Sequence, residues 1–157
     1  MIARHCASAE ETQAAGEAFA AVLRPGDVVL LTGRLGAGKT TFVQGVARGL
    51  GVKERVTSPT FTLVRPHACE NDHGVTTLYH ADVYRAGSLA EVFDLDLTEL
   101  IEESAVALVE WGETAAPVFG DFLKVTITDD DAGGRDLVVE GALVRTREHA
   151  LARWAAA

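Results

Sequence analysis

The feature that most constrains this chain is a glycine-rich stretch, GRLGAGKTTF, at residues 33–42. It follows the short apolar run Val28-Val29-Leu30-Leu31 and precedes a segment whose apolar residues recur at helical spacing. Glycines let the backbone turn its N–H groups around a phosphate, and a helix that follows adds the positive end of its dipole. A turn that only allows tight packing is the alternative, but the flanking strand and helix favour a phosphate-binding loop.

In such a loop the polar residues have separate tasks. Lys39 is expected to reach the β- and γ-phosphates, and the Thr40 hydroxyl is expected to bind Mg²⁺. The loop residues predicted to bind the nucleotide are Gly36, Ala37, Gly38, Lys39, Thr40 and Thr41.

Length, composition and charge exclude several classes of protein. The 157 residues predict a single domain, and no apolar run approaches the roughly 20 residues that span a bilayer. The start, MIARHCASAEET, lacks the apolar core of a signal peptide, so we expect a soluble cytoplasmic protein. Cys6 and Cys69 have no CxxC spacing, which favours two reduced thiols. The net charge of −9 argues against direct binding to nucleic acid, so any RNA would be bound by a partner.

The order of predicted elements indicates an α/β fold. Ser8 and Glu11 form a capping box that starts a helix running to about Arg24. The other predicted elements are strand 28–31, helix 39–50, a hairpin of strands 61–64 and 75–79, helices at 88–92 and 97–102, strand 105–109, a hairpin of strands 122–127 and 137–144, and a last helix capped by Thr146. Strands that alternate with helices predict a mostly parallel central sheet, flanked by helices, with an antiparallel extension.

A second candidate segment, Thr57-Ser58-Pro59-Thr60-Phe61, lies just past the helix that starts at Lys39. Segments at this place in phosphate-loop proteins often sense the γ-phosphate through a hydroxyl and Mg²⁺. Ser58 and Thr60 are therefore candidate switch residues. A plain turn leading into a strand explains the same residues, and the sequence leaves both interpretations open.

Acidic residues follow two predicted strands, in HADVYR (80–85) and EWGE (110–113). Ligands of open α/β sheets bind beyond the carboxyl ends of strands, so Asp82 and Glu110 should lie on the side of the phosphate loop. Either acid could hold Mg²⁺ or orient water, although Asp82 could also be a cap and Glu110 a solvated strand end. His80 could support an acid by a hydrogen bond or be a structural histidine. Trp111 could stack on a base, close the pocket or simply pack.

Taken together, GRLGAGKTTF, SPTFTLV, HADVYR and LVEWGE, in this order and in a short chain, closely resemble the bacterial TsaE (YjeE) family. That family is the ATPase component of the machinery that makes threonylcarbamoyladenosine in tRNA. The resemblance extends from ETQAAG in the first helix to GGRDL in the late hairpin. The Ser-Pro-Thr-Phe and Glu-Trp pieces are specific to the family, and the phosphate loop is not.

The resemblance implies a P-loop NTPase fold and an ATPase that requires ATP and Mg²⁺. Its implied partners are the threonylcarbamoyl transferase TsaD and its inactive paralogue TsaB, with tRNA reached only through them. The modified adenosine would lie next to the anticodon of tRNAs that read ANN codons.

The resemblance also implies roles for single residues. Lys39 would bind phosphates, Thr40 and Glu110 would share Mg²⁺, and Asp82 would support metal or water in hydrolysis. Trp111 would lie beside the nucleotide and the partner surface. The remaining implied sites are Ser58 and Thr60 in the switch, and Thr12 and Arg135 near the nucleoside. The chain departs from the common family pattern at Arg34, usually Asp, and at Gly112, often Pro.

Other functions use the same loop. A small-molecule kinase needs an acceptor pocket and usually an arginine-rich lid, which the sequence does not offer. A GTPase would need an Asn-Lys-x-Asp motif, which is absent from the sequence. A nucleotide-binding adaptor that does not hydrolyse ATP remains an alternative. Arg34 and Arg85 are the only evident candidates for an arginine finger, so hydrolysis should be slow without partners.

Overall fold

The computed structural model describes residues 1–57, 64–83, 99, 101, 104–113 and 115–157. Its strands are β1 (Ile2–Cys6), β2 (Val28–Thr32), β3 (Val64–Ala68), β4 (Thr77–Asp82), β5 (Ala105–Glu110), β6 (Leu123–Asp129) and β7 (Arg135–Glu140). Its α-helices are α1 (Ala9–Phe19), α2 (Lys39–Gly49) and α5 (Glu148–Ala156), and short 3₁₀ helices cover η1 (Ala20–Val22), η2 (Ala116–Val118) and η3 (Ala142–Arg147).

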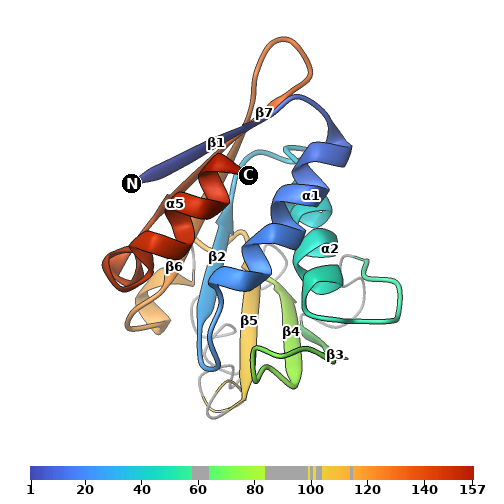
Figure 1. The fold of residues 1–157 in the computed structure, drawn as a ribbon, viewed down its shortest axis with the longest axis vertical. Coiled ribbons are helices and arrows are strands. Elements are labelled where there is room, and N and C mark those ends of the chain that lie inside the picture. The colour runs from blue at the N-terminus through green and yellow to red at the C-terminus, as the bar shows by residue number, and fades with distance from the viewer. Residues whose placement is uncertain (58–63, 84–98, 100, 102–103, 114) are drawn as a thin grey trace.

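The described strands form one sheet in the order β1-β7-β6-β2-β5-β4-β3. The central strands β6, β2, β5 and β4 are parallel, while β1, β7 and β3 pair antiparallel at the two sides. Helices α1, α2 and α5 lie together over one face of this sheet (Figure 1). The predicted α/β fold with a parallel centre and an antiparallel extension is therefore confirmed.

Strand β2 is buried along its whole length because both of its faces are covered. Val29 and Leu31 belong to the core cluster that includes Phe42 of α2, while Val28 and Leu30 belong to a second cluster on the opposite face. A strand buried on both faces has no polar alternation. This explains the uninterrupted apolar run before the glycine-rich loop.

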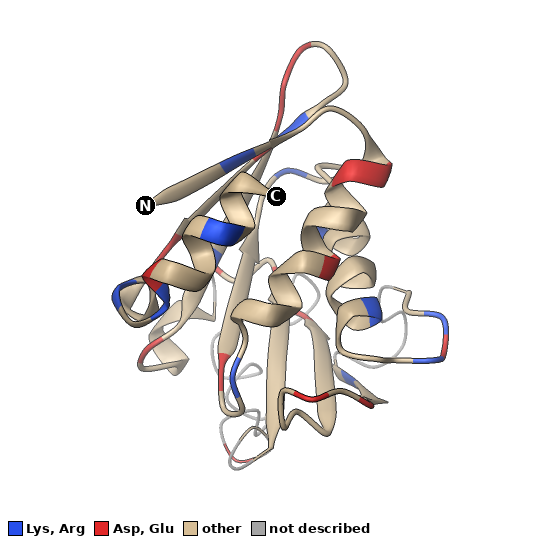
Figure 2. Cartoon of the chain, in the orientation of Figure 1, with Lys and Arg blue, Asp and Glu red and all other residues tan. Residues whose placement is uncertain are grey.

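The charged residues show no single basic face in the orientation drawn. Lys and Arg are scattered over several elements, with Asp and Glu between them (Figure 2). Within the described part of the chain, no helix combines the length and apolar character needed to cross a membrane.

The start of the first helix agrees with the predicted capping box. The Glu11 backbone N–H donates to Ser8 Oγ at 3.2 Å, and the Glu11 carboxylate accepts from the Ala7 N–H at 2.8 Å. The strand β1 before it was not predicted. Its five residues, Ile2–Cys6, are too few to give a clear periodic pattern in the sequence, and the strand is stabilised by pairing with β7.

Other boundaries differ from prediction. The first strand of the 61–64 and 75–79 hairpin lies at 64–68, where Pro66 is tolerated because β3 is a sheet edge; residues 61–63 lie outside the described residues. The last strand ends at Glu140, because the chain turns at Gly141 (φ 113°) into a 3₁₀ helix. Thr146 does not cap the final helix, since its hydroxyl donates to Leu143 O at 2.9 Å. Helix 88–92 lies outside the described residues, as does 97–102 apart from 99 and 101.

Candidate functional site

The glycine-rich loop joins the carboxyl end of β2 to the amino end of α2. Gly38 precedes the helix with a φ of 108°, a left-handed conformation that side chains other than glycine rarely adopt. The first N–H groups of an α-helix have no partners within the helix, and the helix dipole is positive at this end. The local structure therefore has the strand, loop and helix arrangement that binds phosphate in other proteins.

Lys39 lies inside this loop and is 5% exposed. Its Nζ donates to the carbonyl oxygens of Gly33 at 2.7 Å and Arg34 at 2.9 Å. The same Nζ lies 4.0 Å from the centroid of the Trp111 ring, a cation–π contact. Burial lowers the pKa of Lys39 from its ordinary value, and nearby carboxylates, foremost Glu110, oppose that shift.

Glu110 is buried at the end of β5, and each of its carboxylate oxygens contacts a polar side chain of another element. Thr40 Oγ1 donates to Oε1 at 3.0 Å, and His80 Nε2 lies 2.5 Å from Oε2. Asp82 is the register partner of Glu110 in the parallel pair of β4 and β5. The strand ends therefore bring the predicted acids to the edge of the sheet where α2 begins.

A cavity of about 230 Å³ lies at this edge. Its lining contains many of the predicted site residues, namely Gly36, Gly38, Lys39, Thr40, Thr41, Asp82, Glu110 and Trp111, together with Leu35, which was not predicted. Ala37, also predicted to bind nucleotide, is 1% exposed and belongs to the helix-side core. The cavity is thus lined by a buried cation, two threonines and two carboxylates.

These side chains have the chemistry that a magnesium and phosphate ligand requires. Among the described residues, no three His, Cys, Asp or Glu side chains group as a metal site. Mg²⁺, however, prefers oxygen ligands and is usually held by one or two carboxylates together with phosphates and water. The contact between Thr40 and Glu110 places a hydroxyl and a carboxylate oxygen 3.0 Å apart beside Lys39. This pair fits Mg²⁺ bound to phosphate.

Trp111 has a φ of 62°, the only positive value at a described residue other than glycine. A bulky residue in this region is strained, and such strain is concentrated at functional sites. The next residue fixes the turn, because the Gly112 N–H donates to Leu31 O at 3.0 Å. A Cβ at Gly112 would lie 2.5 Å from Leu30 Cβ. Proline at this position would lose this hydrogen bond, and any side chain would crowd Leu30, which explains the glycine.

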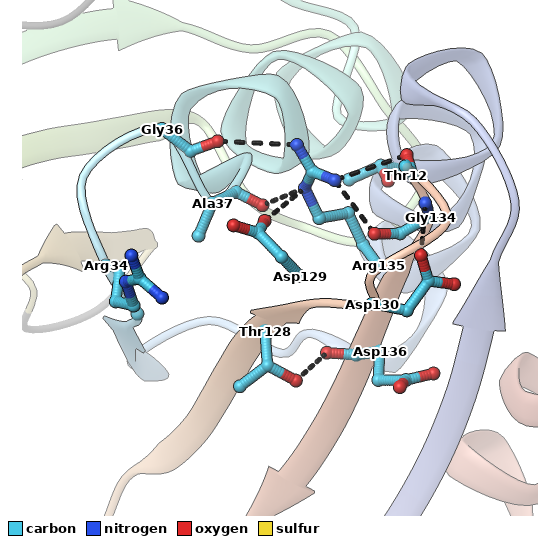
Figure 3. A network of polar contacts seen from close by, with 12 residues as sticks. Thr12, Arg34, Gly36, Ala37, Thr128, Asp129, Asp130, Gly134, Arg135 and Asp136 are labelled. Atoms are coloured by element: carbon cyan, nitrogen blue, oxygen red, sulfur yellow. Dashed lines mark hydrogen bonds and ion pairs between the residues drawn. The ribbon is translucent and has the colours of Figure 1, made fainter.

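Arg135 and Thr12 lie near the loop without lining the cavity. Arg135 Nε donates to Ala37 O at 2.7 Å and pairs with Asp129 Oδ1 at 3.0 Å, as Figure 3 shows. Thr12 is buried, and its hydroxyl donates to Ser8 O at 3.2 Å. Contacts of either residue with a nucleoside stay a prediction. Arg34 lies apart from this network in Figure 3, with no dashed contact to it.

The sequence left the role of one residue near the site open and gave no prediction for another. The sequence did not settle the role of His80, which the structure places against Glu110. Asp129 was not predicted, although it is the cross-strand partner of Arg135 in the late hairpin. Opposite charges flanking a predicted turn are a signal for such a pair. The candidate switch residues Ser58 and Thr60 are outside the described residues.

The sheet, the glycine-rich loop and the cavity define an α/β protein with a candidate phosphate-binding site at the carboxyl edge of its central strand. The particular family follows from comparison with known proteins. Residues 6–137 match the model of the threonylcarbamoyl adenosine biosynthesis protein TsaE. The chain belongs to the TsaE family of tRNA threonylcarbamoyladenosine biosynthesis.

Individual relatives agree with this assignment. The TsaE protein of Treponema pallidum is 45% identical over 77% of this chain and 85% of its own length. The TsaE protein of Bacillus subtilis is 50% identical over 65% of this chain, but the match spans only 61% of that relative. The crystal structure of Bacillus subtilis YdiB superimposes with a TM-score of 0.70 at 32% identity, covering 98% of this chain and 95% of YdiB.

Proposed function

We propose that this chain is the Mg²⁺-dependent ATPase subunit needed to form the threonylcarbamoyl group on the adenosine beside the anticodon of tRNAs that read ANN codons. It binds the complex of TsaD and TsaB and drives turnover of that transferase by binding and hydrolysing ATP. Membership of the TsaE family supports a role in threonylcarbamoyladenosine biosynthesis. One observation supports the ATPase assignment most strongly: buried Lys39 and the hydrogen-bonded pair of Thr40 and Glu110 line the same cavity.

In this proposal each side chain has a defined task. Lys39 exchanges the carbonyl oxygens of Gly33 and Arg34 for phosphate oxygens, which are stronger partners for an ammonium group. Thr40 and Glu110 hold Mg²⁺, and Asp82 supports the metal or orients water. When bound, Mg²⁺ neutralises charge that develops on the phosphates.

The outer residues of the site complete the proposal. Trp111 lies beside the nucleotide and faces the partner surface. Ser58 and Thr60 sense the γ-phosphate, while Thr12 and Arg135 lie toward the nucleoside. We expect this ATPase to act in the cytoplasm.

Contact with tRNA is indirect in this proposal. The net charge is −9, and the Lys and Arg residues visible in Figure 2 are scattered among acidic residues. Binding to nucleic acid depends on clustered Lys and Arg that neutralise phosphates. The transferase complex therefore supplies the tRNA-binding surface, and this chain supplies an ATP-dependent change in docking.

The test is copurification of this chain with TsaD and TsaB in ATP, in ADP and without nucleotide. Association that depends on the nucleotide, together with faster ATP turnover when the pair is added, is the expected result. Turnover that is equally fast with and without the pair would contradict the mechanism.

A change at Glu110 separates an ATPase from an adaptor that only binds ATP. Glu110→Gln keeps the size of the side chain and removes its charge. An ATPase should lose tRNA modification even where ATP still binds, because Glu110 holds the metal. An adaptor should retain modification as long as ATP binds, so retained modification would exclude the ATPase proposal.

A further inference from the structure

His80 lies beneath the candidate metal ligand and outside the cavity. Its side chain is fully buried in β4, and its Nε2 lies 2.5 Å from Glu110 Oε2. Thr40 Oγ1 contacts the other oxygen, Oε1, at 3.0 Å. The Glu110 carboxylate is therefore held from two directions by groups on different elements.

The strand register explains this placement. In the parallel pair of β4 and β5, His80 lies opposite Leu108, and Asp82 lies opposite Glu110. Alternate residues of a strand point to the same face, so His80 shares the face of Asp82, one step farther from the sheet edge. Asp82 and Glu110 line the cavity, whereas His80 does not.

The polar chemistry of the His80 ring is directed at this one carboxylate. A carboxylate that binds a metal is ionised and only accepts hydrogen bonds, so in that state Nε2 is the donor. The other ring nitrogen, Nδ1, is buried and has no hydrogen-bond partner among the described residues. A buried imidazole with a single polar contact would be a poor choice for packing alone, because an unpaired buried polar atom is unfavourable.

We propose that His80 is a positioning residue: its hydrogen bond to Oε2 fixes the Glu110 carboxylate so that Oε1, beside the Thr40 hydroxyl, faces Mg²⁺. This inference rests on the proposed function, because it assumes that Glu110 binds the metal. Residues that orient metal ligands typically contribute 10-fold to 100-fold, as an order of magnitude, to metal affinity. His80 therefore sets the affinity for the metal without touching nucleotide.

The experiment measures Mn²⁺ binding by the loss of free-ion paramagnetic resonance, using protein saturated with ADP. His80→Leu should weaken Mn²⁺ binding roughly 10-fold to 100-fold, while the affinity for ADP measured in chelator stays unchanged. His80→Gln should restore most of the Mn²⁺ affinity, because its terminal amide can donate from near the position of Nε2. His80→Asn should not restore the Mn²⁺ affinity, because its amide is one bond too short to reach the position of Nε2. If His80→Leu fails to fold, His80→Asn takes its place as the variant that lacks the contact.

The chain offers a matched control in His67. Its side chain is also fully buried, and its Nδ1 lies 2.6 Å from Glu54 Oε1, a contact away from the cavity. His67→Leu removes a buried histidine that also contacts a carboxylate, although Glu54 is exposed where Glu110 is buried, and it should leave Mn²⁺ affinity unchanged. Equal Mn²⁺ affinities for the His80 and His67 variants, or weak binding in His80→Gln equal to that of His80→Asn, would overturn the positioning role.

The wild-type protein distinguishes this failure from failure of the proposed function. Wild-type protein with ADP should bind Mn²⁺ more tightly than free ADP does. If it does not, the metal assignment of Glu110 is wrong, and the role of His80 is wrong with it.

Discussion

Arg135 of β7 donates from Nε to the carbonyl oxygen of Ala37 at 2.7 Å, although the two residues are 98 positions apart in sequence. The C=O and N–H of one trans peptide unit point in opposite directions. By holding Ala37 O, Arg135 therefore turns the Gly38 N–H away from itself. The late hairpin thus orients part of the glycine-rich loop, and Asp129 Oδ1 lies 3.0 Å from Arg135 Nε.

Arg135→Gln should weaken ADP binding because the loop loses the contact that orients this peptide. A loss of roughly tenfold corresponds to about 1.4 kcal/mol, close to the lower end of the contribution of hydrogen bonds to charged groups. Titration calorimetry with ADP measures the change. Arg145→Gln, at an exposed arginine of the 3₁₀ helix η3, is the control and should bind like wild type. Equal affinities for both variants would contradict the orienting role.

Gly38→Ala should lower the free energy of unfolding by about 1–2 kcal/mol, the strain of a left-handed conformation in a residue with a Cβ. The added methyl would meet its nearest atoms at 3.7 Å, an ordinary contact, so crowding does not contribute. Gly120→Ala is the matched change, because Gly120 has no positive φ and open space around it. Urea unfolding should place Gly120→Ala within about 0.5 kcal/mol of wild type; a similar loss in both variants would refute the strain argument.

Nucleotide should change the fluorescence of Trp111 because Lys39 leaves its ring to meet phosphates. The chain has 2 tryptophans, and the second, Trp154, is buried in α5 against Phe19 of α1 and is not part of the cavity lining. Trp154→Phe isolates the signal of Trp111, and Trp111→Phe isolates that of Trp154. We expect ADP with Mg²⁺ to alter emission in the first variant only. A change confined to the second would place the nucleotide elsewhere.

The affinity for ADP should fall as the solution becomes alkaline. The fall should begin at a lower pH than it would if Lys39 had the pKa of an ordinary lysine. In the proposed function the protonated form of Lys39 binds phosphate, and burial lowers the pKa of Lys39 below the usual 10.5 in the free protein. As pH rises through that lowered pKa, the cation is lost and binding weakens. Calorimetry at intervals between about pH 7.5 and 10 measures the decline. Lys39→Met should bind weakly with little pH dependence, and a parallel decline in that variant would assign the effect to another group.

Much of the fold followed from local patterns. The Ser8 and Glu11 capping box predicted the first helix, and the apolar runs predicted β2 and β5. The predicted elements were wrong where a contact with a residue distant in sequence determines the structure. Strand β1 has only five residues and depends on β7, and the last strand stops at Gly141, where a Cβ would lie 2.3 Å from Phe122 O.

The sequence by itself determined the glycine-rich loop between its strand and its helix, because strand, glycines, lysine and helix lie within about 15 consecutive residues, and such short-range geometry depends on backbone preferences. It also placed Asp82 and Glu110 at strand ends. Only the tertiary structure decided that His80 contacts Glu110 and that Arg135 holds Ala37. The physical reason is that these contacts join residues 30 and 98 positions apart. Their distance in space depends on strand order and register, which are fixed by packing of the buried faces of the whole sheet.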